Sequence, residues 1–132
     1  QRPMAHYHAW HSQNAWLRQI HGRNPLYVPK AVWEAQGFRD GDWARVTSPQ
    51  GSITVPVARM DALNPNTVWT WNAIGKRAGA WALTPDSPEA MRGFLLNHVI
   101  SEWLPAQQGF RLANADPVTG QAAWYDLRVR VT

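Results

Sequence analysis

The sequence predicts a mainly β fold with short helices, and three observations support that fold class. Residues 43–59 have the pattern of a β-hairpin, residues 124–131 alternate between apolar and polar side chains, and each helical segment is short. This order of elements fits a small β-barrel decorated by helices better than a doubly wound parallel sheet. The 132 residues suffice for one domain, and no repeat or linker divides them.

The N-terminal part predicts a strand followed by a helix. Residues 4–10 are rich in aromatic side chains and His, which favours a strand. Ser12 or Asn14 can then cap a short helix over residues 15–20, because their side-chain oxygens accept hydrogen bonds from the free N–H groups of the first turn.

A second strand and a second helix are predicted next. Residues 26–28 form a β-prone run. Pro29 marks the start of a helix over about residues 30–36, because a proline costs no hydrogen bond in the first turn. Gly37 suits the left-handed position that closes many helices, and Phe38 can pack back onto the last turn.

The β-hairpin is the clearest local signal. Strand 43–47 leads into a Ser-Pro-Gln-Gly turn at residues 48–51, and residues 52–59 return with their β-branched side chains on one face. Pro56 lacks a donor for the ladder, which predicts a sheet edge or a bulge at that position. A further turn leads to a predicted strand over residues 67–71.

The pattern is looser between residues 72 and 117. Ser87 can cap one short helix, and apolar side chains at four-residue spacing favour a second helix over residues 94–104. Irregular segments of this length are uncommon in a compact domain unless they bind something. This interval is therefore a candidate binding region.

The composition excludes several classes of function. The absence of Cys excludes thiolate metal ligands, disulfides and a cysteine nucleophile. No stretch approaches the roughly 20 apolar residues that cross a bilayer. The chain starts at Gln1 without an apolar leader-like run, so we expect a fragment of a larger protein.

Motifs of a self-contained catalyst are missing. There is no Gly-x-Ser-x-Gly elbow, no Gly-x-Gly-x-x-Gly and no Walker loop. His6 and His8, with His11 nearby, are candidate metal ligands, but no fourth ligand follows at a spacing typical of zinc sites. A hydrogen bond to a neighbour or a ligand is the favoured interpretation of these histidines.

Uncharged polar side chains are frequent in loop-like positions, where amides can recognise the edges of heterocycles. These polar residues, with one carboxylate among them, are Ser12, Gln13, Asn14, Asn72, Asn97, Asn114, Asp116, Thr119 and Gln121. Arg2, Lys76 and Arg77 are candidates for phosphate contacts. Each Asn alone is better explained as a turn cap, so the binding hypothesis depends on the whole set.

The order of these motifs resembles the molybdopterin-dinucleotide-binding domain that ends catalytic subunits of the dimethyl sulfoxide reductase family. The resemblance covers nearly the whole chain, and its middle stretch is the most recognisable signature. The stretches that carry it are residues 2–8, 12–14, 24–53, 97, 114–121 and 125–131. Each motif is loose alone, and their order and spacing together are specific.

The resemblance implies a double-psi β-barrel of the aspartate decarboxylase-like type. Its loops would hold a bis(molybdopterin guanine dinucleotide) cofactor with molybdenum or tungsten. By position, the residues implied on the pterin and phosphate side are Arg2, His6, His8, Ser12, Gln13 and Asn14. Those implied near the second dinucleotide are Asn97, Asp116 and Gln121, and Asn72 from the polar set completes the predicted cofactor-binding residues.

Residues 69–77 and 95–98 are most similar to subunits that act on sulfur compounds, such as sulfite dehydrogenases and polysulfide or thiosulfate reductases. In that family the metal ligand and the iron–sulfur cysteines lie upstream, so we expect no catalytic residue, no metal ligand and no turnover in this chain alone. The implied partners are the remaining domains of the same subunit, a membrane anchor subunit, plus an iron–sulfur electron-transfer subunit, with no nucleic acid. The compartment stays open between cytoplasm and periplasm.

A single-stranded nucleic-acid-binding β-barrel is the alternative from a different class. The formal charge of +4 and the nine tryptophans motivate it, because aromatic side chains stack on bases and basic grooves follow phosphates. The basic residues are dispersed along the chain and form no block, which makes this the minority hypothesis.

Overall fold

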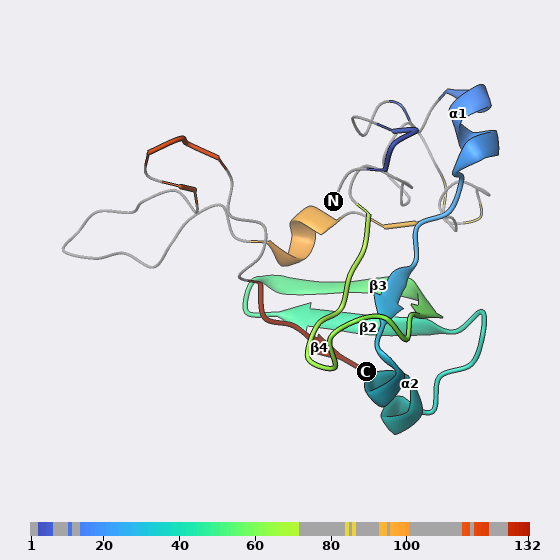
Figure 1. The fold of residues 1–132 in the computed structure, drawn as a ribbon, viewed down its shortest axis with the longest axis vertical. Helices are drawn as coiled ribbons and strands as arrows, with labels where there is room; N and C mark the ends of the chain where they lie inside the picture. Colours follow the sequence, from blue (N-terminus) through green and yellow to red (C-terminus); the bar gives the residue numbers. More distant parts are fainter. Residues whose placement is uncertain are drawn as a thin grey trace.

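Short strands and helices alternate along the described part of the chain (Figure 1). The computed structural model describes residues 3–6, 11, 14–71, 84, 86, 93–94, 96–100, 115–116, 118–121 and 127–132. Its elements are α1 (Ala15–Ile20), β1 (Leu26–Val28), α2 (Lys30–Gln36), β2 (Trp43–Ser48), β3 (Gly51–Arg59), the 3-10 helix η3 (Leu96–Val99) and β4 (Arg130–Val131). The predicted class, mainly β with short helices, is confirmed.

The four strands form one sheet in the order β1-β3-β2-β4. The predicted hairpin is confirmed, because β2 and β3 pair antiparallel from Ser48 opposite Gly51 to Trp43 opposite Pro56. β1 lies parallel to β3, and β4 pairs antiparallel with β2. The end of the chain therefore returns to the hairpin and becomes one edge of the sheet.

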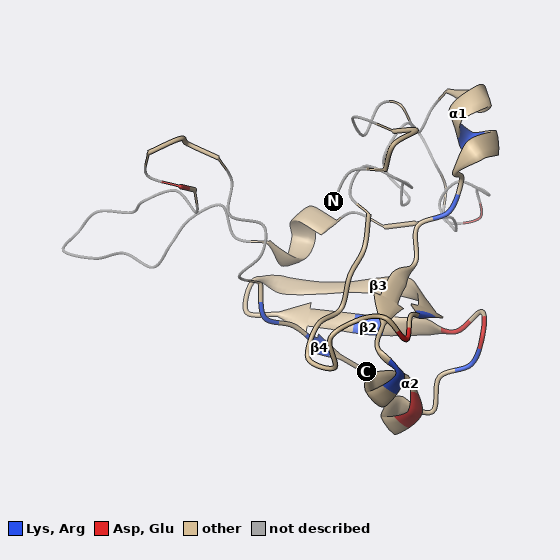
Figure 2. Ribbon diagram, viewed as in Figure 1, with Lys and Arg blue, Asp and Glu red and all other residues tan. Residues whose placement is uncertain are grey.

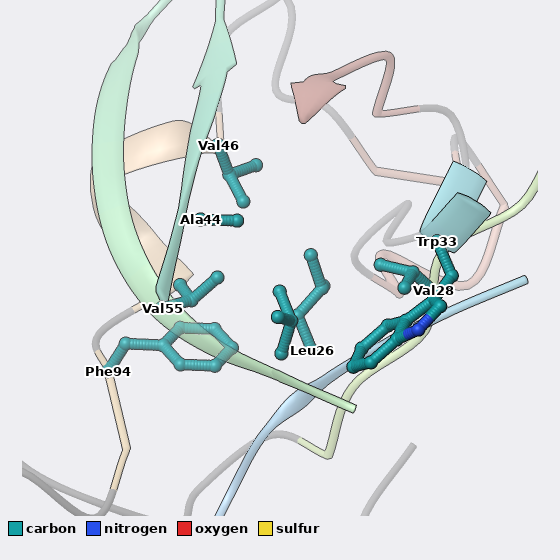
Figure 3. Close-up of a cluster of buried hydrophobic side chains, with 8 residues drawn as sticks. Leu26, Val28, Trp33, Ala44, Val46, Val55 and Phe94 are labelled. Atoms are coloured by element: carbon teal, nitrogen blue, oxygen red, sulfur yellow. The ribbon is translucent and has the colours of Figure 1, made fainter. Parts of the chain in front are cut away.

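The core lies on one face of this sheet, which curls around it as a half-barrel (Figure 3). Alternation along β2 and β3 turns their small and β-branched side chains inward, and α2 contributes one large ring. The buried cluster consists of Leu26, Val28, Trp33, Ala44, Val46, Val55, Val57 and Phe94. Each fully buried aliphatic side chain of this kind contributes roughly 1.5–3 kcal/mol, so this cluster stabilises the framework on which the rest is mounted.

Helix α2 begins and ends as its sequence predicts. Pro29 occupies the N-cap, and Gly37 adopts the left-handed conformation with φ 68°. The N–H of Phe38 donates to Trp33 O at 3.1 Å, and the two rings meet with centroids 5.8 Å apart. Among the described residues, none of the helices has the length and apolar character needed to cross a membrane.

The predicted strand over residues 4–10 is wrong where the structure describes it. Met4 and Ala5 form a turn, and the N–H of His6 donates to Pro3 O at 3.1 Å. The turn carries the His6 ring toward α1, a tertiary contact that local strand propensity cannot foresee. Residues 7–10 lie outside the described part, as does the helix predicted after Ser87.

The predicted helix over residues 94–104 is also wrong in its described part, which contains only the 3-10 turn η3. The carbonyl of Val99 accepts a hydrogen bond from Ser48 Oγ at 2.8 Å, so the hairpin holds η3 in place. The predicted strand at residues 67–71 is reduced to one antiparallel bridge between Trp69 and Tyr27.

Pro56 lies on an interior strand, contrary to the prediction of an edge or a bulge. Backbone donors alternate in direction along a strand, and Val57 N–H points to β2, where it donates to Asp42 O at 3.0 Å. Pro56 N therefore faces the β1 side, where pairing starts only at Val57. A proline is tolerated here because no ladder bond is lost.

Candidate functional site

Asn14, one of the predicted cofactor-binding residues, caps α1. Its Oδ1 accepts hydrogen bonds from the backbone N–H of Trp16 at 2.9 Å and of Leu17 at 3.3 Å. This confirms the predicted helix start and fixes the orientation of the side chain. Asn14 is exposed, and its amide nitrogen is not used in these two bonds, so it can donate to a ligand.

His6 fastens the N-terminal segment to α1. Its side chain is 0% exposed, and its Nε2 lies 3.2 Å from Leu17 O. Leu17 O also accepts the backbone N–H of His21 at 3.0 Å. A carbonyl can only accept, so Nε2 of His6 carries the proton. Within the described residues, Nδ1 of His6 has no hydrogen-bond partner.

His21 lies beside His6, with ring centroids 6.5 Å apart. Burial lowers the pKa of His21, and the neighbouring His6 lowers it further, so its imidazole is neutral at pH 7. Its Nε2 is buried and also finds no partner among the described residues. An unpaired buried polar atom costs about 1–3 kcal/mol, so this His6–His21 junction is less well satisfied than the sheet.

An aromatic row follows the β1 edge of the sheet. We use this name for Tyr27, Trp69, Trp71 and His21, whose successive ring centroids are 5.2, 4.4 and 5.8 Å apart. Tyr27 and Trp69 also exchange backbone hydrogen bonds of 2.7 and 2.9 Å, which fixes the row to the sheet. The rings are half-buried, so the row forms part of the molecular surface.

The buried Asn24 fixes the aromatic row by hydrogen bonds. Its Nδ2 donates to Trp71 O at 2.7 Å, and its Oδ1 accepts from the Thr70 hydroxyl at 3.0 Å. Asn24 therefore joins the segment before β1 to the backbone of Trp71 and holds the end of the aromatic row in place.

Asn97 lies on η3, against the turn of the hairpin. Val99 of the same turn is buried, whereas Asn97 is exposed, and no side-chain hydrogen bond of Asn97 is found within the described residues. The approach is close, because a Cβ on Gly51 would lie 2.6 Å from His98 O. The hairpin therefore positions η3 and leaves the Asn97 amide open to a ligand.

Asp116 and Gln121 are brought together by one turn. Asp116 Oδ1 accepts from Val118 N at 3.0 Å, Thr119 N at 2.7 Å and Thr119 Oγ1 at 2.9 Å. The backbone and side-chain donors of Thr119, followed by the backbone donor of Val118, hold the pKa of Asp116 below its usual value. Asp116 N donates to Gln121 O at 2.7 Å, which closes the turn and leaves the Gln121 side chain exposed.

The predicted binding residues that the structure describes occupy three separate places. His6 and Asn14 lie at α1, Asn97 lies on η3, and Asp116 with Gln121 forms the distant turn, with η3 between the other two in Figure 1. The remaining predicted residues, Arg2, His8, Ser12, Gln13 and Asn72, lie outside the described part. Among the described residues, no group of three His, Asp or Glu could hold a metal ion.

Two residues at this site were not predicted from the sequence. His21 and Asn24 follow the predicted first helix, and neither has a spacing that signals a role. Their importance comes from partners far along the chain, because Asn24 contacts Trp71 and His21 contacts both Trp71 and His6. The one local signal is the adjacent Pro25, which keeps Asn24 out of a helix.

Two comparisons with known proteins agree. The sequence model of the molydopterin (molybdopterin) dinucleotide binding domain matches residues 1–109. The chain is 62% identical over 132 residues to a sulfite dehydrogenase subunit of Allochromatium vinosum, an alignment that covers 99% of this chain. The chain spans 14% of the length of that relative. Since the family match covers most of the sequence and agrees with the order of motifs, the chain belongs to the molybdopterin dinucleotide binding domain family.

Proposed function

We propose that the chain binds a bis(molybdopterin guanine dinucleotide) cofactor as one module of a longer molybdenum oxidoreductase subunit. The observation that carries this proposal is the family match over residues 1–109, together with 62% identity to a sulfite dehydrogenase subunit. When bound, the cofactor supplies two-electron redox chemistry at its metal. The chain itself supplies hydrogen bonds and orientation, and we expect no turnover from the chain alone.

The exposed polar groups suit the edge of a purine. Asn97 and Gln121 present amides, which both donate and accept, and the ionised carboxylate of Asp116 accepts from N–H donors. The fixed turn holds Asp116 ready to accept, because three donors already orient the carboxylate and keep it charged. We therefore assign both places, Asn97 on η3 and the Asp116–Gln121 turn, to the dinucleotide end of the cofactor, each to a different part of it.

The α1 end suits another portion of the same cofactor. Asn14 offers an amide N–H, and we assign Arg2, His6, His8, Ser12 and Gln13 to the pterin and phosphate portions by the family resemblance, with Asn72 as a further cofactor-binding residue from the polar set. A dinucleotide cofactor is long, so its contacts need not share one pocket. The separation of α1 from the Asp116 turn in Figure 1 is compatible with a ligand that spans both.

We further propose that the half-barrel belongs to a complete double-psi β-barrel. Each edge of the observed sheet ends in a short pairing, β4 on one side and the bridge to Trp69 on the other. Closure removes such unpaired edges. The strands that would close the barrel must come from residues outside the described part.

The name of the relative suggests the chemistry of the longer subunit. We propose that it oxidises sulfite or a related inorganic sulfur compound, with electrons passed to partner subunits, one of them an iron–sulfur protein and the other a membrane anchor. The residues that would choose the substrate and the metal lie outside this chain. Sulfite-dependent reduction of a dye by the longer subunit, lost when the cofactor is withheld, is the direct measurement.

The structure gives the nucleic-acid alternative little support. A single-strand groove needs aromatic rings and basic side chains side by side. Here the aromatic row follows the β1 edge, whereas Arg45 and Arg130 lie on β2 and β4 toward the opposite edge (Figure 2). Arg45 and Arg130 are therefore separated from the aromatic row by the width of the sheet, and Arg59, which lies beside β1, forms an ion pair with Asp61.

A guanosine diphosphate titration tests cofactor binding by the chain. With the uniformly 15N-labelled 132-residue chain, we expect shifts in the side-chain amides of Asn97 and Gln121, with smaller shifts for adenosine diphosphate. The Asn97→Ala variant should bind guanosine diphosphate about five-fold more weakly, because one hydrogen bond contributes about 1 kcal/mol. Gln36→Ala, an exposed amide on α2, is the matched control and should bind normally.

The titration can also contradict the proposal. If β2 and β3 give the dispersed signals of a folded sheet but millimolar guanosine diphosphate moves neither Asn97 nor the Asp116 turn, these residues do not hold a guanine nucleotide. Equal shifts with both nucleotides would remove the assignment of Asn97, Asp116 and Gln121 to guanine recognition.

A further inference from the structure

Helix α1 has an apolar face that the described part of this chain does not cover. The helix has six residues, none of them buried. Trp16 and Ile20 are 77% and 72% exposed, and their spacing of four residues places them on the same side of the helix. Large apolar side chains that gather on one exposed face mark an interaction surface more often than singly scattered ones do.

Helix α1 also has few stabilising contacts with the described part of the chain. A helix shorter than about 12 residues is marginal in water without tertiary packing. α1 receives its Asn14 cap and the contact of His6 with Leu17 O, and the adjoining His6–His21 junction has two buried imidazole nitrogens without a partner among the described residues. Both observations indicate that α1 is incomplete without a further contact.

The size of the face indicates what covers it. The side chains of Trp16 and Ile20 offer on the order of 300 Å² of apolar surface, whereas a stable interface between separate proteins buries about 800 Å² per partner. A second copy of the chain would therefore gain too little from this face. A segment tethered on the same polypeptide needs much less area, because tethering gives it a high effective concentration.

We propose that the Trp16–Ile20 face of α1 docks the remaining polypeptide of the longer subunit in which this module lies. The inference rests on the proposed function, because it takes the chain as one module of that subunit. The comparison with the sulfite dehydrogenase subunit supports this inference. The two sequences are 62% identical over 99% of this chain, yet the chain spans only 14% of the length of that subunit. The docked segment is apolar where it meets the Trp16 ring.

Hydrogen–deuterium exchange compares α1 in two contexts: the 132-residue chain and the longer subunit prepared without cofactor. The reporters are the amides of Arg18 and His21, which bond to Asn14 O and Leu17 O. We expect both amides to exchange at least about ten-fold more slowly in the longer subunit. The Val57 amide, bonded to Asp42 O within the hairpin, should be equally slow in both and reports that the chain is folded.

Variants of the longer subunit provide a second measurement that does not depend on the isolated chain. Trp16→Ser combined with Ile20→Ser should return the Arg18 and His21 amides to fast exchange and leave Val57 slow. The matched control is Ala31→Ser combined with Ala35→Ser, an exposed pair at the same spacing on α2, which should change none of these rates.

Each alternative outcome overturns the docking proposal. Equal exchange of α1 in both contexts means that the remaining polypeptide does not cover the face. Protection that depends on the concentration of the 132-residue chain assigns the face to a second copy, and protection that appears only after cofactor loading assigns it to the cofactor. Slow α1 exchange in the cofactor-free subunit supports docking even if the guanosine diphosphate titration fails, so the two proposals are tested separately.

Discussion

The hairpin core and the α1 region are built in different ways. In the hairpin, β2 and β3 pair residue by residue, and their inward side chains join Leu26 and Trp33 in one apolar cluster. In the α1 region no helical side chain is buried, and His6 and His21 contribute buried nitrogens without partners among the described residues. Among the described residues, the first region is therefore held by dense apolar packing, whereas the second has few buried contacts.

This difference is common in modules that hold a ligand. Regions with dense apolar packing open rarely, and regions with few buried contacts open at low free-energy cost. The predicted binding residues Asn14, Asn97, Asp116 and Gln121 are exposed and lie outside the core cluster. The framework and the proposed binding surface are thus separate parts of the chain, and substitutions can test that separation.

The largest contrast is expected between two leucines. Leu26→Ala empties part of the core cluster and should lower the free energy of unfolding by about 2–5 kcal/mol. Leu17→Ala, at a half-buried position of α1, should cost less than about 1 kcal/mol. Urea unfolding monitored by circular dichroism measures both. Equal losses would show that α1 is as firmly packed as the hairpin.

A smaller effect is expected where the hairpin meets η3. Gly51→Ala places a Cβ 2.6 Å from His98 O, so either backbone must shift, at a cost of about 1–3 kcal/mol. Gly37→Ala is the control, because its Cβ would meet no atom within 4 Å. Its cost of about 1–2 kcal/mol comes only from the left-handed backbone conformation at φ 68°, which an L side chain disfavours. Amide shifts of Val99 should change in Gly51→Ala alone. If they stay unchanged, η3 is not held by the hairpin turn.

The His6–His21 junction predicts a pH dependence smaller than either effect. The folded-state pKa of His21 lies below its ordinary value of 6.5, so the unfolded chain binds the proton more readily. The stability is complete above about pH 6.5 and falls as the pH drops toward the lowered folded-state pKa. Thermal unfolding between about pH 5 and pH 8 should show this loss.

Variants assign the pH dependence to one residue. His21→Phe should flatten the slope below about pH 6.5, and His98→Gln on exposed η3 should keep the slope of the wild type. An unchanged slope in His21→Phe would remove the junction as the cause.

The smallest effect is expected on the outer surface of α2. Lys30 and Glu34 lie 3.8 Å apart at a spacing of four residues, and both side chains are more than half exposed. Glu34→Gln should change the free energy of unfolding by less than about 0.5 kcal/mol, because solvent screens such pairs. A loss as large as that of Gly51→Ala, measured by the same urea titration, would contradict the view that the framework is held by its core.

Local signals predicted the elements whose causes are local. The hairpin follows from its Ser-Pro-Gln-Gly turn and alternation, and α2 ends at Gly37 as expected. The Asn14 cap was predicted on the same grounds, whereas the described part of the strand predicted over residues 124–131 contains only β4, Arg130–Val131. Each of these signals operates within a few residues, where backbone geometry and side-chain chemistry alone decide the outcome.

The differences from the predictions coincide with contacts to distant partners. The turn at Met4 brings His6 to Leu17, and the carbonyl of Val99 accepts a hydrogen bond from Ser48 of the hairpin. The carbonyl of Trp71 accepts a hydrogen bond from Asn24. The free energy of each such bond depends on which segments the fold brings together, and no window of sequence contains that information.

The sequence by itself determined the family, the mainly β class and the chemistry of the exposed polar residues, because motifs and alternation are properties of residue order. Tertiary structure alone decided that β3 is an interior strand, that His6 and His21 meet, and that Asn97 and Asp116 lie in different places. The physical reason is that long-range contacts depend on chain closure and on competition among burial, backbone pairing and side-chain hydrogen bonds over the whole molecule.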